Sequence, residues 1–163
     1  MEKEWERFKS IKDSLLIGIY AKQLSIHQYE NKQILISDEP VLEIRNSKTN
    51  EIKYWKLDWL ETMEGDDLLI VKEQETPEPL AYESIDAPYQ KHIISGSSYF
   101  PQKQEIKHVS GYGFTNGDSQ YLTSIILQLE ASFIHIHTGP VIETKITSIK
   151  PDVFEDIIFT TTS

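Results

Sequence analysis

The sequence predicts an α+β protein that is mainly β, built from antiparallel strands around one core, with a short helix at its N-terminus. Apolar and polar residues alternate along most of the chain, which is typical of strands with one buried face. Turn-forming residues separate these runs, and Asn116-Gly117 is the strongest of the hairpin signals. An internal repeat is the third observation. A closed barrel and a two-sheet sandwich are both compatible with this many strands.

The repeat relates residues 26–43 to residues 126–143, which align without a gap. Eight of the eighteen positions are identical, and in the first copy they are Ile26, Gln28, Glu30, Ile34, Ile36, Pro40, Val41 and Glu43. We therefore interpret the chain as a single domain made of two similar halves, about 1–72 and 91–163, joined by an acidic, proline-containing connector over 73–90. This interpretation requires Ile34 and Ile134 to occupy equivalent places in a shared interior.

A short amphipathic helix is predicted over 2–12, because Trp5, Phe8 and Ile11 recur at spacings of three and four residues. Glutamate and lysine fill the other side of this helix. A helix of about three turns is marginal alone, so its aromatic side is expected to pack against the sheet.

Strands account for most of the remaining chain. The apolar runs predict strands or hairpin arms over 14–30, 33–37, 41–46, 52–60, 68–72, 92–100, 105–114, 119–130, 133–138, 143–151 and 152–162. Asn31-Lys32 is predicted to be a hairpin tip. The stretch 57–67 is predicted to close as a helical turn that Gly65 ends.

The composition excludes several classes of function. The net charge is −10 and the sequence pI is about 4.9, so we expect neither nucleic acid nor a membrane as a partner, because phosphate binding needs a basic face. The chain has no cysteine, which excludes disulfides, thiol catalysis and cysteine-ligated metal centres. The N-terminus is not a signal peptide, and no apolar run approaches the ~20 residues of a membrane span. We expect a cytoplasmic protein.

Candidate metal ligands lie in the second copy of the repeat. A hairpin tip at Ala131-Ser132 would pair Gln128 with His135 and would put both of them, with Glu130 and His137, on the face opposite the core. The two imidazoles would then lie ~7 Å apart on one side of a strand, close enough to share a divalent metal. Glu130 or Glu143 could supply an oxygen ligand, so a metal-binding or small-molecule-binding protein is the alternative functional interpretation.

The first copy of the repeat argues for a plainer interpretation of these histidines. It has Leu35 and Ser37 where the second copy has His135 and His137, so the repeated structure does not require histidine. The alternative is that both histidines are ordinary solvent-facing residues without a functional role.

A possible partner-binding set lies beside the acidic connector. Tyr54, Trp55 and Trp59 are aromatic residues next to many carboxylates, a combination that suits a basic protein partner. The alternative is that Trp55 and Trp59 pack in the core. Gln128, which the repeat matches with Gln28, is the fourth candidate contact, and its alternative role is a hydrogen bond between strands.

The sequence favours a non-enzymatic protein without a cofactor. It contains no GxSxG nucleophile motif, no cysteine, and no serine that a recognisable motif places beside a histidine. In being free of cysteine, rich in strands and strongly negative, the chain resembles the small acidic proteins that bacteria encode in toxin–immunity clusters. This resemblance implies a protein-interaction module whose partner is a basic protein such as a toxin. Exposed strand edges would also allow a homodimer.

Overall fold

The computed structural model describes residues 2–139 and 141–162, and these form one helix and fourteen strands. In chain order they are α1 (Glu2–Lys9), β1 (Leu15–Ala21), β2 (Ser25–Gln28), β3 (Lys32–Ser37), β4 (Val41–Arg45), β5 (Ile52–Glu61), β6 (Asp67–Gln74), β7 (Tyr82–Ala87), β8 (Gln90–Ile94), β9 (Ser97–Tyr99), β10 (Ile106–Asn116), β11 (Ser119–Leu129), β12 (Phe133–His137), β13 (Ile142–Thr147) and β14 (Asp156–Thr160). The mainly β fold with antiparallel sheets and a short N-terminal helix is confirmed.

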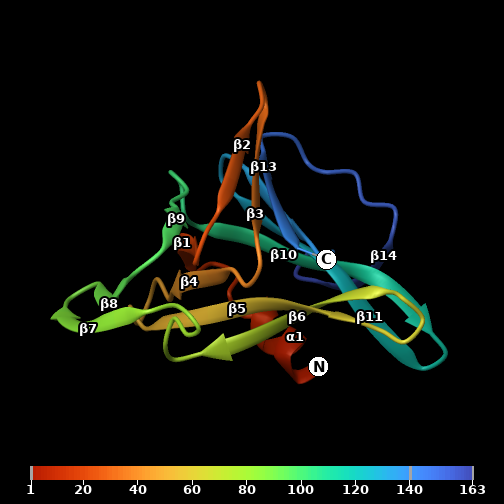
Figure 1. The fold of residues 1–163 in the computed structure, drawn as a ribbon, viewed down its shortest axis with the longest axis horizontal. Helices are drawn as coiled ribbons and strands as arrows, with labels where there is room; N and C mark the ends of the chain where they lie inside the picture. Colours follow the sequence, from red (N-terminus) through yellow and green to blue (C-terminus); the bar gives the residue numbers. More distant parts are fainter. Residues whose placement is uncertain (1, 140, 163) are drawn as a thin grey trace.

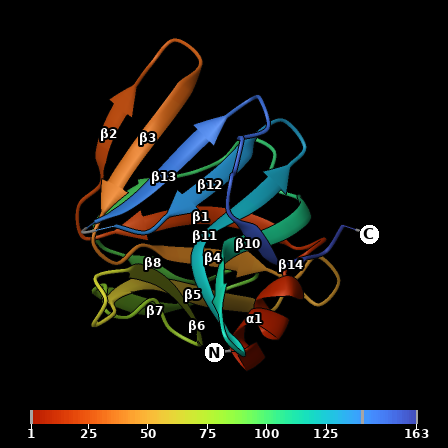
Figure 2. The same ribbon diagram turned by 90° about the vertical axis from the view of Figure 1, so that its right-hand side faces the viewer.

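The strands form two large sheets and one small hairpin (Figures 1 and 2). The five-stranded sheet, called sheet A, has the order β6-β5-β4-β1-β9, and the seven-stranded sheet, called sheet B, has the order β14-β10-β11-β12-β13-β3-β2. The two sheets are linked where β1 and β10 begin. There the Asp13 N–H donates to the carbonyl of Ile106 at 2.7 Å, and the Ile106 N–H donates to the carbonyl of Ser14 at 2.9 Å.

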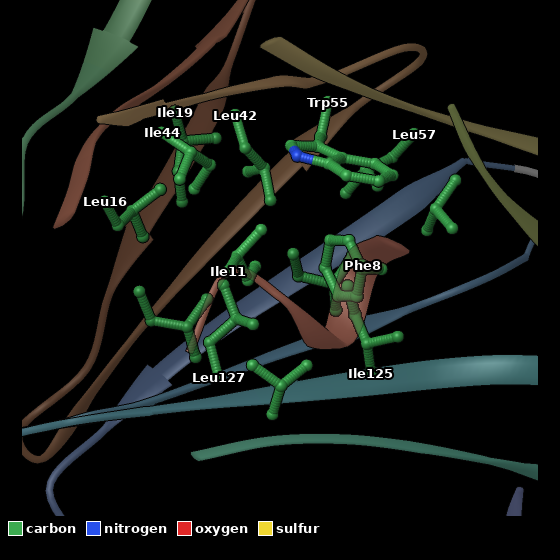
Figure 3. Close-up of a cluster of buried hydrophobic side chains, with 14 of the residues drawn as sticks. Phe8, Ile11, Leu16, Ile19, Leu42, Ile44, Trp55, Leu57, Ile125 and Leu127 are labelled. Atoms are coloured by element: carbon green, nitrogen blue, oxygen red, sulfur yellow. The ribbon is translucent and has the colours of Figure 1, made fainter. Parts of the chain in front are cut away.

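The facing sides of the two sheets share one hydrophobic core (Figure 3). Sheet A contributes residues such as Leu42 and Trp55, and sheet B contributes Ile125 and Leu127, all of them buried. Their side chains alternate along each strand with residues of the outer faces, as the strand period of two requires. Because apolar burial contributes about 25 cal/mol per Å², this interior is the main source of stability.

Helix α1 closes one open side of this core. It contacts β6 and β14, which are the edge strands of sheets A and B on that side. Phe8 is fully buried and packs edge-on against Trp55 of sheet A, with ring centroids 5.1 Å apart. The Phe8 ring also lies 6.4 Å from that of Phe159 in sheet B. The helix is therefore held by its aromatic side, as its shortness requires.

The two halves of the sequence exchange strands instead of forming one sheet each. The β2–β3 hairpin of the first half joins sheet B, because β3 pairs with β13. In return β9 of the second half joins sheet A beside β1. The β2–β3 hairpin also projects beyond the rest of the molecule (Figures 1 and 2).

The repeated hairpins share a pairing register but not an orientation. Adding 100 to each pair between β2 and β3 gives a pair between β11 and β12. Ile134 is fully buried in the core, whereas Leu35 is the core residue of β3 and Ile34 is half-buried on the opposite face. The expectation that Ile34 and Ile134 are equivalent is wrong, because β3 turns the alternate set of side chains inward. Pro140, a further position of the repeat, lies outside the described residues.

One expectation for the middle of the chain is also wrong. Residues 57–67 form no helical turn, because β5 continues to Glu61 and a hairpin turn leads into β6, with Gly65 at a φ of 88°. Strand pairing there outweighs the local polarity of the sequence. The connector 73–90 is mostly exposed and holds the end of β6 and all of β7, and Leu80 within it is buried.

Replacing Phe8 with alanine tests the role of α1. The Phe8→Ala change should lower the free energy of unfolding by about 3–5 kcal/mol, because it leaves a cavity between the two sheets. Urea denaturation measures this. Lys3→Ala, on the exposed side of the same helix, should change it by less than about 0.5 kcal/mol. Equal effects of the two changes would mean that the helix does not close the core.

Candidate functional site

The outer face of sheet B carries the predicted histidines, in a register that differs from the expected one. Ile126 lies opposite His135, and Ser124 lies opposite His137. The predicted pairing of Gln128 with His135 is wrong by two residues, because the two-residue tip lies one residue earlier, at Glu130-Ala131, where the Leu129 N–H donates to the carbonyl of Ser132 at 2.8 Å. A shift of two residues preserves the faces, so Gln128, His135 and His137 do share the face opposite the core.

His135 is buried even though it lies on the outer face, with only 8% of the residue exposed. Burial lowers the pKa of His135 to about 4, and the nearby His137 and Lys145 act in the same direction, while Glu155 and Glu143 oppose them. The imidazole is therefore neutral near pH 7. Glu155 belongs to the connector between β13 and β14, and it returns to the sheet to accept a hydrogen bond from Thr123.

Three buried polar atoms on this face have no hydrogen-bond partner among the described residues. They are Nε2 of His135, Oγ of Ser124 and Nδ1 of His108, which lies opposite Gln128, and Ser124 is completely buried. Such groups usually bind a partner or an ordered water, because an unpaired buried donor or acceptor costs about 1–3 kcal/mol. A neutral imidazole and a hydroxyl can each donate or accept one bond with a small polar molecule.

Of the two expected oxygen ligands, Glu143 lies directly opposite His137, whereas Glu130 lies elsewhere. Glu130 is exposed in the β11–β12 turn, where it pairs with Lys103 at 3.3 Å. His135 and His137 do lie close together, with ring centroids 6.0 Å apart. Within residues 2–139 and 141–162, however, no group of three or more histidine, aspartate or glutamate side chains is arranged to hold a metal ion.

The four residues expected to bind a partner are distributed over three environments. Tyr54 is fully buried on the outer side of sheet A, and Trp55 is buried in the shared core. Trp59 is half-buried and packs against that core. Gln128 is half-buried on the outer face of sheet B. Tyr54 and Trp55 therefore present no surface to a partner.

The outer face of sheet A carries a buried carboxyl group that the sequence did not single out. Glu43 is only 4% exposed and accepts a hydrogen bond from the Tyr20 hydroxyl at 2.8 Å. Burial raises the pKa of Glu43, while the bond from Tyr20 and the charge of Arg45 lower it. Burial, and then the charge of Glu43, raise the pKa of the Tyr20 and Tyr54 phenols. In the sequence, Glu43 stands inside the mainly apolar run VLEIR, and in the structure every residue of this run except Arg45 is buried.

The β7–β8 hairpin covers this carboxyl group. Among the described residues no backbone hydrogen bond joins the hairpin to either large sheet, so side chains hold it in place. His92 is the main contact, because its Nδ1 lies 2.9 Å from the Tyr54 hydroxyl. Arg45 lies over the ring of Tyr89 at 5.1 Å, and Leu80 packs with Tyr54 in a second small core. We call this hairpin, residues 82–94, the flap.

A group of carboxylates lies at one end of sheet A, which we call the acidic end. The Leu57 N–H donates to the carbonyl of Pro40 at 2.9 Å, so the β3–β4 turn lies beside the last part of β5. The carboxylates of this end are Asp38, Glu39, Glu61, Glu64, Asp66 and Asp67. Of these six carboxylates, only Glu39 has a cationic group of the described residues within 4 Å, since Lys56 lies 3.8 Å from it. The acidic end therefore presents charge that the protein does not neutralise itself.

The β5–β6 turn holds most of this charge in a fixed shape. Thr62 organises the turn, because its N–H donates to the carbonyl of Asp66 at 2.7 Å and its hydroxyl accepts the Asp66 N–H at 3.1 Å. Glu61 and Asp67 lie directly opposite each other at its base. Like charges at opposed positions destabilise a strand pair. Met63 is fully exposed at the tip.

Comparison of the chain with protein-family models, with curated proteins and with solved structures gave no match. Within the described part of the chain, no helix has the length and the apolar character that crossing a membrane requires.

Replacing His135 tests the environment of the outer face of sheet B. The unfolded chain binds a proton on this histidine below about pH 6.5, whereas the folded protein does so only near pH 4. Lowering the pH from about 7.5 to about 5 should therefore cost about 2 kcal/mol of stability through His135 alone. In His135→Gln this part of the loss should disappear. Urea denaturation of the wild type and of His135→Gln at both pH values measures it.

Replacing Tyr54 tests the attachment of the flap. Tyr54→Phe removes the hydroxyl that bonds to His92 and should cost about 1–2 kcal/mol. Hydrogen exchange of the amides in 82–94 should become about tenfold faster, because the flap then opens more often. Amides of β10 and β11 should exchange as before, and so should the flap in Tyr29→Phe, a change at an exposed tyrosine. Uniformly faster exchange would show that the flap does not open by itself.

Proposed function

We propose that this chain is a non-enzymatic protein-interaction module that binds a basic protein partner through its acidic end. The observation that carries the proposal is the opposition of Glu61 and Asp67 in a turn where, among the described residues, no cationic group lies within 4 Å of either carboxylate. This arrangement costs the free protein stability, and positive side chains of a partner would remove the repulsion. A surface that is less stable alone than it could be is typical of a binding site.

The shape and composition of the β5–β6 turn fit such a role. Three backbone or hydroxyl hydrogen bonds hold it, so a partner would lose little binding free energy in ordering it. Met63 and the half-exposed Leu60 supply apolar contact between the carboxylates. Methionine is enriched at the centres of interfaces, while unpaired surface charges steer a partner of opposite sign.

The net charge of the chain supports the same choice of partner. At −10, the protein attracts basic molecules over distances of about a Debye length and repels acidic ones. Such steering increases association rates by about 10-fold or more at low salt, and the increase is lost as salt rises. A basic toxin, as implied by the resemblance to immunity-type proteins, is one partner of this class.

A variant with four substitutions, each of which removes one negative charge, tests the proposal. Changing Glu61 and Glu64 to glutamine and Asp66 and Asp67 to asparagine should weaken capture of the partner by about tenfold or more, and high salt should weaken capture by the wild type. The measurement is affinity capture from lysate at low and high salt, followed by titration of the captured basic protein against each variant.

The matched control removes the same charge from other surfaces. It carries Glu83→Gln, Asp86→Asn, Asp118→Asn and Asp152→Asn, all at exposed positions. This control should bind as the wild type does. If the two variants lose binding equally, the attraction depends on net charge alone and the acidic end is not the binding surface. If neither variant loses binding, the proposal is wrong.

A further inference from the structure

A cavity of about 200 Å³ lies beside the acidic end. The last residue of β1, the chain that follows it, the β3–β4 turn and the turn before the flap surround it. Its lining residues are Ala21, Lys22, Gln23, Asp38, Glu39, Pro79 and Leu80. Since Asp38 and Glu39 belong to the acidic end, the cavity opens onto the surface proposed to bind a partner.

The lining of this cavity is divided into an apolar floor and a charged rim. Ala21 and Leu80 are almost completely buried, so they form its floor. Asp38 and Lys22 are exposed at its rim. A narrow apolar floor below carboxylates matches a side chain that has an aliphatic stem and a cationic head.

We propose that this pocket holds a lysine or arginine side chain of the basic partner, an inference that rests on the proposed function. The stem of the basic side chain lies on Ala21 and Leu80, and its cationic head is bound by Asp38. The volume is sufficient for one such side chain. Anchors of this kind, buried in a pocket and surrounded by charged contacts, carry most of the binding energy in many interfaces.

The charges at the rim give each residue a distinct role. Glu39 already has Lys56 at 3.8 Å, whereas Asp38 has no cationic group within 4 Å among the described residues. Asp38 is therefore the carboxylate that is free to bind an incoming cation. Lys22 has the opposite effect, because its positive charge repels the ligand at the same rim. Removing Lys22 should therefore strengthen binding, and removing the charge of Asp38 should weaken it.

A second copy of this chain is a poorer occupant than a basic partner. Two chains that each carry −10 repel each other, and the acidic end would face further carboxylates in most orientations. The charge of the surface around the pocket thus selects a molecule of opposite sign.

The test uses two blocked tripeptides, acetyl-Gly-Arg-Gly-amide and the same peptide with neutral citrulline in place of arginine. Each is titrated into the ¹⁵N-labelled full chain, and the backbone amide signals of Ala21, Gln23 and Leu80 are followed. The arginine peptide should shift these signals in a saturable manner, and the citrulline peptide should bind at least about threefold more weakly, because it lacks the charge. Lys22→Met should tighten binding of the arginine peptide, and Asp38→Asn should weaken it to the level of the citrulline peptide.

Asp118→Asn, a loss of one exposed carboxylate far along the chain, is the control and should bind as the wild type does. Equal binding of the two peptides, or an unchanged affinity in Asp38→Asn with a native amide spectrum, would overturn the inference. Failure of the pocket inference can be distinguished from failure of the proposed function. If the β5–β6 turn variant loses the partner while Asp38→Asn binds both peptide and partner normally, the acidic end binds a partner without using this pocket.

Discussion

The contact of Phe8 with Trp55 and Phe159 is the interaction on which the rest of the structure depends. It connects the N-terminal helix to both large sheets at once, at the side where their edge strands β6 and β14 would otherwise leave the core open to water. With that side closed, the remaining aliphatic residues of the two sheets are removed from solvent together. The charged turns, the flap and the projecting hairpin all extend from this common interior.

The central position of β4 explains why the chain buries a carboxyl group outside the core. Leu42 and Ile44 face the shared interior, so Glu43 must face outward. The flap then covers that outer face and excludes most of the water from Glu43. The Tyr20 hydroxyl and the nearby Arg45 compensate part of the desolvation of this carboxyl. Part of the outer face of sheet A is thus covered as well, by a hairpin that belongs to neither large sheet.

Much of this fold could be predicted from residue patterns, and the failures have specific physical causes. The helix around Phe8 and the β10–β11 hairpin at Asn116-Gly117 follow from spacing and turn chemistry, which are local. Which residues of β11 and β12 face inward was also predictable, because a strand alternates strictly. The orientation of β3 was not, since its partner β13 lies far away in sequence and determines which of Ile34 and Leu35 turns inward.

The candidate surfaces were less predictable than the fold for the same reason. His135 and His137 could be placed on one face from their spacing, but the burial of His135 could not, because a local pattern does not show which distant segments, such as the one that brings Glu155 near it, lie beside this face. Tyr54 and Trp55 are aromatic neighbours on opposite faces of β5, and only the position of the flap decides that Tyr54 is buried as well. The pocket beside Asp38 joins three segments that are separate in sequence, so no local pattern could indicate it.

The exchange of strands between the two halves has a consequence for folding during synthesis. Residue 37 of β3 pairs with residue 142 of β13, so the projecting hairpin leaves the ribosome long before the strand beside which it belongs. Until then the inward side of β3 has no native neighbour, and such unpaired edges favour contact with other unfinished chains. Sheet B can be completed only after the residues of β14 have been made, and its folding is therefore governed by pairings between distant parts of the chain.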